Sequence, residues 1–307
     1  MSDSKGVNRL YLVLVAVFIG TGYMLARVIP VEVPLYASLI ISQSVVLVPA
    51  LLYCWKRKVS VKELIPHRKI RFSTGVLVVV TTYLMYPLMI VLNAVTLLFT
   101  DSAVAGMQSG LLDINFLVAT LLIAVVPACV EEFVFRGVLF QTYRKKRVFS
   151  AIILSGFLFG CMHMNLNQFA YAFFMGIYAA FLVEATGSIF SSILAHFTLN
   201  FTGVMLSGIL KILYKGDEMS PVLEQTGNFL QNDRMYVFMM LIGILVWFVI
   251  AVGTTVGAVA IYIHICKKNG RWEHMKTIFR KEKEERMITI PLILAVTVAI
   301  VEIIISI

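Results

Sequence analysis

The chain has 307 residues, of which 60% are hydrophobic and 14% are charged, and its formal net charge is +9. This composition excludes a soluble globular domain, because it is far from the usual balance of apolar and charged residues. The basic residues gather in short loops between long apolar runs, so the net charge is a topology signal. No nucleic-acid partner is predicted from it.

Nine apolar runs divide the chain, and each is a candidate membrane span, for which ~20 residues cross a hydrocarbon core about 30 Å thick. Their approximate bounds are 10–29, 33–53, 74–100, 116–143, 148–164, 169–183, 189–213, 235–266 and 288–307. The fifth and sixth runs are the shortest and are separated by a predicted tight turn at Asn165, Asn167 and Gln168. We therefore predict an all-α, polytopic membrane helix bundle of about nine transmembrane helices, with eight as the alternative count.

The placement of lysine and arginine predicts the orientation of these spans. With the N-terminus in the cytoplasm, 21 basic residues fall in cytoplasmic segments and four on the other side, with Arg136 left inside a span. An excess of basic residues in short cytoplasmic loops is the usual pattern. The N-terminus is therefore expected in the cytoplasm, and the basic loops at 56–71 and 267–286 are expected to meet anionic lipid headgroups. Short loops without a targeting segment are typical of a bacterial plasma-membrane protein.

Two glycine pairs allow neighbouring helices to approach closely, and the first is expected to draw the fifth run close to a neighbour one turn before His163. Gly156-x-x-x-Gly160 and Gly253-x-x-x-Gly257 are small-x-x-x-small patterns, which let neighbouring backbones come near each other. Two further acidic residues, Glu184 and Glu302, fall near the ends of spans and are expected at the membrane interface.

Three polar clusters interrupt the apolar runs in the middle of the chain. They are Glu131-Glu132-x-x-x-Arg136, Phe159-x-x-x-His163 and His196-x-x-x-Asn200. Ionisable groups inside hydrocarbon are costly unless they pair with one another or serve a function. At 1.5 Å per residue, Glu131, His163 and His196 lie roughly 18, 22 and 11 Å from the inner side, so one shared site is plausible.

The spacing within the clusters predicts which side chains share a face. Glu132 and Arg136 are four residues apart and can form an ion pair, whereas Glu131 is turned about 100° away and left for chemistry. His196 and Asn200 also share a face, and their N–H groups can face a developing oxyanion. The structural alternative is that these polar groups only hold the helices together. For Phe159, ordinary packing and the exclusion of water are equally open roles.

Three mechanisms fit these side chains. Glu131, helped by His163, can act as a general base that activates water. Alternatively Glu131, His163 and His196 can bind a divalent metal such as zinc, with an open position for water. A nucleophilic serine or cysteine is poorly supported, since no G-x-S-x-G occurs. The missing H-E-x-x-H favours glutamate-activated water over the metal, and both a metal and no cofactor stay open.

In this order the three motifs resemble the CPBP family of intramembrane proteases. That family includes type II CAAX prenyl endopeptidases and bacterial Abi or lysostaphin-resistance-A-like proteins, and the resemblance covers about residues 115–205. It implies an all-helical core with a cavity that opens toward the cytoplasmic side. It also implies roles: Glu131 and His163 activate water, His196 and Asn200 stabilise the oxyanion, and Glu132 with Arg136 organises the site. Metal-dependent and glutamate-dependent members both remain models for this chain.

The resemblance divides the chain and directs the functional prediction. Residues 1–114 are expected to be N-terminal transmembrane helices, 115–205 the catalytic core, and 206–307 C-terminal transmembrane helices. The predicted activity is that of an endopeptidase on a membrane-embedded or lipidated peptide or protein, without specificity for a prenyl group. A non-proteolytic scaffold or bacteriocin-immunity protein is the main alternative, and a proton-coupled transporter is the third.

Overall fold

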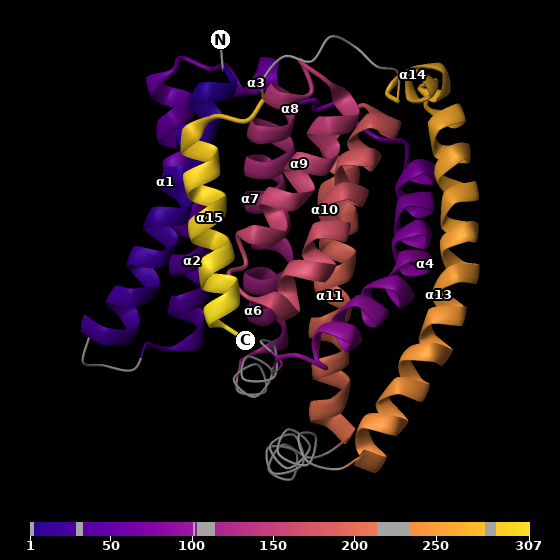
Figure 1. The fold of residues 1–307 in the computed structure, drawn as a ribbon. Coiled ribbons are helices and arrows are strands. Elements are labelled where there is room, and N and C mark those ends of the chain that lie inside the picture. Colours follow the sequence, from indigo (N-terminus) through magenta and orange to yellow (C-terminus); the bar gives the residue numbers. More distant parts are fainter. Residues whose placement is uncertain (1–2, 29–32, 101, 103–113, 214–233, 280–286) are drawn as a thin grey trace.

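The helical bundle is seen in a computed structural model that describes residues 3–28, 33–100, 102, 114–213, 234–279 and 287–307. Within these residues all regular elements are helices, and one isolated bridge joins His67 to Ser188. The helices run roughly side by side, and the N-terminus and C-terminus lie toward opposite ends of the bundle (Figure 1). The predicted all-α class is therefore confirmed for the described part of the chain.

Within the described residues, seven helical stretches are long and apolar enough to cross a membrane, which makes the chain an integral membrane protein. They are α1 with η1 (Ser4–Tyr23 and Met24–Val28), α2 (Leu35–Lys56), α4 (Phe72–Thr96), the continuous helix α6 to α8 (Phe116–Tyr143), α10 (Leu166–Thr186), α11 (Ile189–Leu213) and α13 (Arg234–Lys268).

The fifth and ninth predicted spans form apolar helices of 14 and 16 residues, α9 (Val148–Cys161) and α15 (Ile290–Ile305). At 1.5 Å per residue they rise about 21 and 24 Å, which is less than the hydrocarbon thickness. The predicted count of nine spans and the cytoplasmic N-terminus stay predictions. Two short helices, α3 (Val61–Leu64) and α14 (Trp272–Thr277), lie in the basic loops.

The fourth span contains two stretches of wider turn that the sequence did not predict. Its parts are α6 (Phe116–Ala119), the π-helix η2 (Thr120–Val125), α7 (Val126–Glu132), the π-helix η3 (Phe133–Leu139) and α8 (Phe140–Tyr143). Glu131 and Glu132 are the last two residues of α7, at the point where the wider turn begins. Wide turns inside α-helices occur frequently at functional sites.

Helices α9 and α10 pack closely through the first predicted glycine pair. A Cβ on Gly156 would lie 2.9 Å from the backbone nitrogen of Ile177, and one on Gly160 would lie 3.0 Å from the carbonyl oxygen of Phe169. The first contact is shorter than real Cβ atoms make and the second is tighter than most of them make, so the close approach predicted for this pair is confirmed. In the second pair, a Cβ on Gly257 would lie 3.7 Å from Cδ1 of Leu84 on α4, an ordinary contact, and one on Gly253 would meet no described atom within 4 Å, so this pattern does not mark a comparably close approach.

The turn between α9 and α10 lies slightly earlier than predicted, at 162–165, because Asn167 and Gln168 belong to the first turn of α10. Asn165 caps α10, and its side chain accepts a hydrogen bond from the backbone N–H of Gln168 at 2.8 Å. At the other end of α10, Gly187 has a φ of 67°, the left-handed conformation that favours glycine after a helix. The two ends position α10 as the central partner of α9 and α11.

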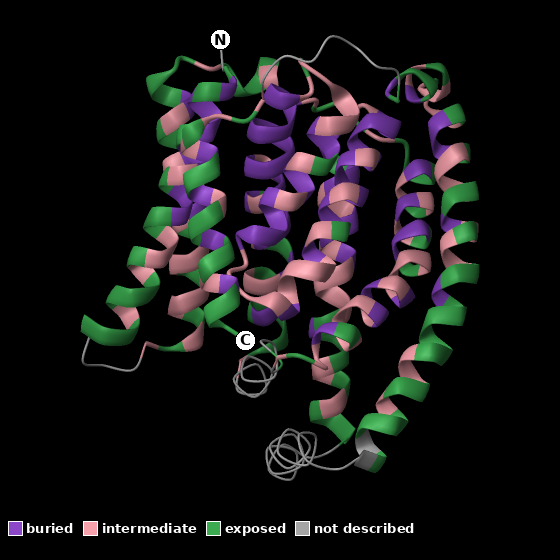
Figure 2. Cartoon of the chain, viewed as in Figure 1, coloured by how far each residue is buried: buried purple, intermediate pink, exposed green. Residues whose placement is uncertain are grey.

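Burial is concentrated in the middle of the bundle. Buried residues gather on the helices between α7 and α11, whereas the outer surfaces of α1, α13 and α15 are largely exposed (Figure 2). The exposed side chains of α13 are large and apolar, among them Phe238, Leu245 and Phe248. An apolar outer surface around a buried centre is what contact with lipid requires.

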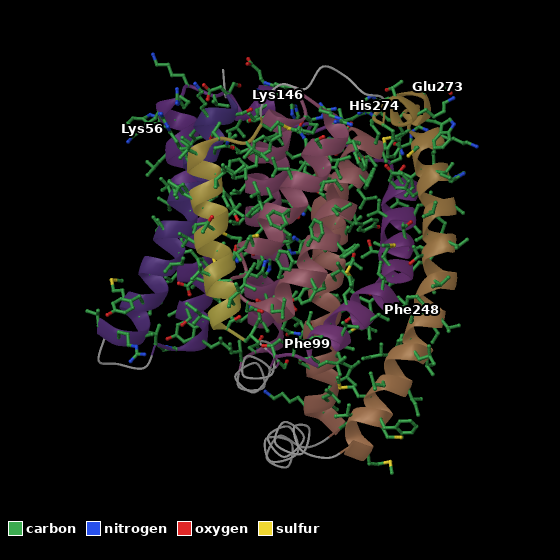
Figure 3. All side chains as sticks on the ribbon, viewed as in Figure 1. Lys56, Phe99, Lys146, Phe248, Glu273 and His274 are labelled. Atoms are coloured by element: carbon green, nitrogen blue, oxygen red, sulfur yellow. The ribbon has the colours of Figure 1, made fainter. Side chains whose placement is uncertain are left out.

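The charged loops gather at one end of the bundle. Figure 3 places Lys56, Lys146, Glu273 and His274 at the end where the N-terminus lies, and Phe99 and Phe248 away from it. This grouping agrees with basic loops on a single side of a membrane.

Candidate active site

Four helices meet where the three polar motifs come together. Glu131 and Glu132 end α7, Arg136 lies in η3, His163 follows the end of α9, and His196 and Asn200 are one turn apart on α11. The fourth helix is α2, which packs against α7. The structure joins five of the six predicted residues into one cluster of contacts.

Glu132 is the centre of this cluster. Its Oε1 lies 3.1 Å from Nη1 of Arg136 and 3.0 Å from Nδ1 of His196. The side chains of Glu132 and Arg136 are both 0% exposed, so their charges have no access to water. The ion pair predicted from the four-residue spacing is therefore present. Its buried carboxylate also holds a histidine from another helix.

His196 lies between the two glutamates. A carboxylate accepts hydrogen bonds, so Nδ1 of His196 donates to Glu132. Its other ring nitrogen, Nε2, lies 3.8 Å from Oε2 of Glu131. Glu132 thus fixes the orientation of the ring, in the way that the carboxylate of a catalytic triad orients its histidine.

Glu131 is the more accessible of the two glutamates, with a side chain that is 16% exposed. Its Oε1 accepts a hydrogen bond of 3.0 Å from Nε2 of Gln43 on α2. The sequence analysis did not select Gln43, although a glutamine flanked by Ser42 and Ser44 in an apolar run is a visible polar interruption.

Phe159 is the packing centre of the site. The guanidinium carbon of Arg136 lies 4.4 Å from the centre of its ring, a cation–π contact. The rings of His163 and His196 lie edge-on to it, with centroids 5.0 and 5.8 Å away. Of the two roles left open for Phe159, packing is therefore observed, and it involves three of the polar residues.

His163 has one ring nitrogen occupied and one available. Its Nδ1 lies 3.0 Å from the carbonyl oxygen of Phe159, and since a carbonyl only accepts, Nδ1 carries the proton. In the neutral ring Nε2 then holds a lone pair. His163 is also within electrostatic range of Glu131 and His196.

Asn200 is the predicted residue that stands apart. Among the described residues, its amide Nδ2 donates to the carbonyl oxygen of Ile123 in η2 at 2.9 Å, rather than to another member of the cluster. The amide has a second N–H, which this bond does not use.

The side chains of the cluster offer few free ligands for a metal ion. Within the described residues, no group of three or more His, Cys, Asp or Glu side chains is close enough to hold one. Glu132 and the Phe159 carbonyl occupy one ring nitrogen of His196 and of His163 respectively. The arrangement does not form a ready three-ligand site, and the predicted set of Glu131, His163 and His196 stays a prediction.

Comparisons with known proteins agree with the motifs. A family model described as Rce1-like, type II CAAX prenyl endopeptidase Rce1-like, matches residues 113–202. No curated protein and no solved structure matched the chain. The family resemblance predicted from the three motifs is confirmed over this segment, which contains all six site residues.

Proposed function

Because residues 113–202 carry an Rce1-like segment, we propose that the protein is an intramembrane endopeptidase that uses water activated by Glu131 and His163. The observation that carries the proposal is the position of His196, with Nδ1 on Glu132 and Nε2 facing Glu131. A structural ion pair between Glu132 and Arg136 needs neither a second glutamate nor a bridging histidine. The extra groups supply a base and a donor that face one space.

In the first step Glu131 acts as the general base. It takes one proton from a water molecule. The other O–H of that water donates a hydrogen bond to the lone pair on Nε2 of His163, which orients the water. The water oxygen forms a bond to the carbonyl carbon of the peptide, and the carbonyl electron pair moves to its oxygen. A tetrahedral oxyanion results.

In the second step the N–H groups of α11 stabilise this oxyanion. With Nδ1 bonded to Glu132, a proton on Nε2 makes His196 a cation. Glu131 is neutral after the first step, so the formal charges of the oxyanion, Glu132, Arg136 and His196 add to zero, which a site of low dielectric favours. The second N–H of Asn200 is the other donor. The carbon–nitrogen bond then breaks, and the leaving nitrogen takes the proton held by Glu131.

The substrate class follows from where the site lies. Its charged members are buried between apolar helices, so we propose a hydrophobic or lipid-tethered peptide, without a required prenyl group. The proposed setting is a bacterial plasma membrane, with the N-terminus and basic loops in the cytoplasm on anionic headgroups. Lys56, Lys146 and His274 lie at the same end of the bundle, which supports the placement of the basic loops on one side of the membrane (Figure 3).

The test compares peptide termini in cells carrying the native chain and cells carrying Glu131→Ala at matched abundance. Mass spectrometry of membrane-protein and secreted-peptide ends should reveal ends that need Glu131. Identical termini, together with rescue of a deletion phenotype by Glu131→Ala, would favour a scaffold or immunity protein. Proton-coupled uptake that survives loss of His196 would favour a transporter. Elemental analysis of the purified protein tests the metal route separately.

A further inference from the structure

We propose that Gln43 is a positioning residue for Glu131, so that α2 completes the candidate active site. The inference rests on the proposed function, in which Glu131 takes the proton of the attacking water. Gln43 lies outside residues 113–202, the part of the chain that matches the family model. Its contact therefore assigns a role to the N-terminal helices, for which the motifs give none.

The two oxygens of Glu131 have different partners. Oε1 receives the N–H of Gln43 at 3.0 Å, whereas Oε2 lies 3.8 Å from Nε2 of His196. The last torsion of a glutamate side chain is broad and roughly two-fold, so an unheld carboxylate samples many orientations. A charge-assisted hydrogen bond to one oxygen fixes the plane of the group and directs the other oxygen toward the histidine.

The neighbours of Gln43 on α2 satisfy their polar groups differently. The hydroxyls of Ser42 and Ser44 donate to carbonyls of their own helix, Leu39 at 2.9 Å and Ile40 at 2.7 Å. Only the amide of Gln43 among these three reaches another helix. Gln43 is thus placed to act on α7 rather than to satisfy α2.

The other end of the amide argues against a purely structural role. Oε1 of Gln43 is buried and has no hydrogen-bond partner among the described residues. An orphan acceptor in a buried place is costly, so a glutamine kept only for helix packing would be expected to satisfy both ends. An O–H or N–H donor that enters with water or a peptide backbone would satisfy this oxygen next to Glu131.

The experiment uses the full chain and three variants. Gln43→Met keeps the length of the side chain and removes its polar atoms. Gln43→His keeps an N–H donor at about the same distance from Cβ. Ser44→Ala is the matched control, because its hydroxyl bonds only its own helix. The probe is a quenched fluorescent peptide with the sequence around a terminus that requires Glu131 in the native chain.

We expect Gln43→Met to lower kcat at least tenfold with little change in KM and in the melting temperature. Gln43→His should recover most of that loss, and Ser44→Ala should match the native chain. Native kcat in folded Gln43→Met, or in Gln43→Ala if the methionine variant does not fold, overturns the inference while the proposed function stands. A Gln43→His variant as slow as Gln43→Met also overturns it. If no terminus requires Glu131, both the proposed function and this inference fail.

Discussion

Gly176 on α10 faces the guanidinium of Arg136, and a Cβ added to Gly176 would lie 2.9 Å from Nη2 of that arginine. The same Cβ would lie 2.7 Å from the Cα of Gly156. Two glycines on neighbouring helices therefore leave the space in which Arg136 reaches Glu132. We expect Gly176→Ala to lower stability by about 1–3 kcal/mol through overpacking and to reduce cleavage, because Arg136 must move. Thermal unfolding in detergent and the abundance of Glu131-dependent termini measure the two effects.

The control for this prediction is Gly203→Ala on α11, the helix of His196. A Cβ there would meet no described atom within 4 Å. It should leave cleavage unchanged and raise stability by up to about 1 kcal/mol, since alanine is the better helix former. Equal behaviour of the two alanine variants would mean that the space beside Arg136 does not matter.

The variant His163→Asn tests the roles of the two ring nitrogens of that histidine separately. The asparagine amide can still donate to the carbonyl of Phe159, as Nδ1 does now, but nothing replaces the lone pair on Nε2. We expect a rate at least about 100-fold lower with a melting temperature close to that of the native chain. His264→Asn, in the exposed part of α13, is the control for a generic loss of histidine. Cleavage by His163→Asn at the native rate would remove His163 from the mechanism.

Glu184 on α10 binds two arginines and one histidine away from the candidate site. It is 1% exposed, and its carboxylate lies 2.6 Å from Nε of Arg144, 3.3 Å from Nη2 of Arg271 and 2.6 Å from Nε2 of His274. These contacts hold α14 and the loop before it to the central helices. Glu184→Gln should lower stability by about 2 kcal/mol or more, since two arginines lose their anionic partner.

The matched control is Glu273→Gln on α14. Glu273 pairs with Lys276 at 2.6 Å but is 83% exposed, so its loss should cost at most about 1 kcal/mol. Thermal unfolding compares the two variants, and hydrogen exchange in α14 should increase only for Glu184→Gln. Equal exchange in both would show that Glu184 does not anchor this helix.

The proposed orientation predicts which positions a membrane-impermeant maleimide can reach. With exposed Cys129 changed to serine, Lys146→Cys should react only in inverted vesicles. A cysteine added after Ile307 should react only in right-side-out vesicles. The reverse pattern would place the N-terminus outside. Reaction of both positions from one side would require an even number of spans between residue 146 and the C-terminal cysteine.

Much of the fold could be predicted because the helices of this chain are defined by hydrophobic length. The predicted runs 116–143 and 189–213 coincide with the observed helices, and the others differ by a few residues at their ends. The ion pair of Glu132 and Arg136 was predictable for a similar reason, since both residues are on one helix and a fixed spacing relates them.

The remaining features depend on contacts between helices, which no spacing within one helix encodes. A lone glutamine in an apolar run, such as Gln43, has no partner within its own segment, and Gly176 gains its meaning only from Arg136 on another helix. Glu184 was expected at the interface because its sequence neighbours mark the end of a span. Its three partners, Arg144, Arg271 and His274, come from distant positions and bury it. The residues of η2 and η3 do not differ in type from those of the α-helix around them, so their wide turns could not be predicted from the sequence.

The cluster around Glu131 is assembled from distant parts of the chain, and this sets when it can form during synthesis. Gln43 precedes Glu131 by 88 residues, and His196 follows Glu132 by 64. Since a polypeptide emerges from the ribosome N-terminus first, α2 is already in place when α7 arrives, but the histidine that joins the glutamates comes last. A nascent chain that ends before α11 therefore holds two glutamates without the histidine between them, and under the proposed function such a ribosome-bound fragment is not yet able to cleave a peptide.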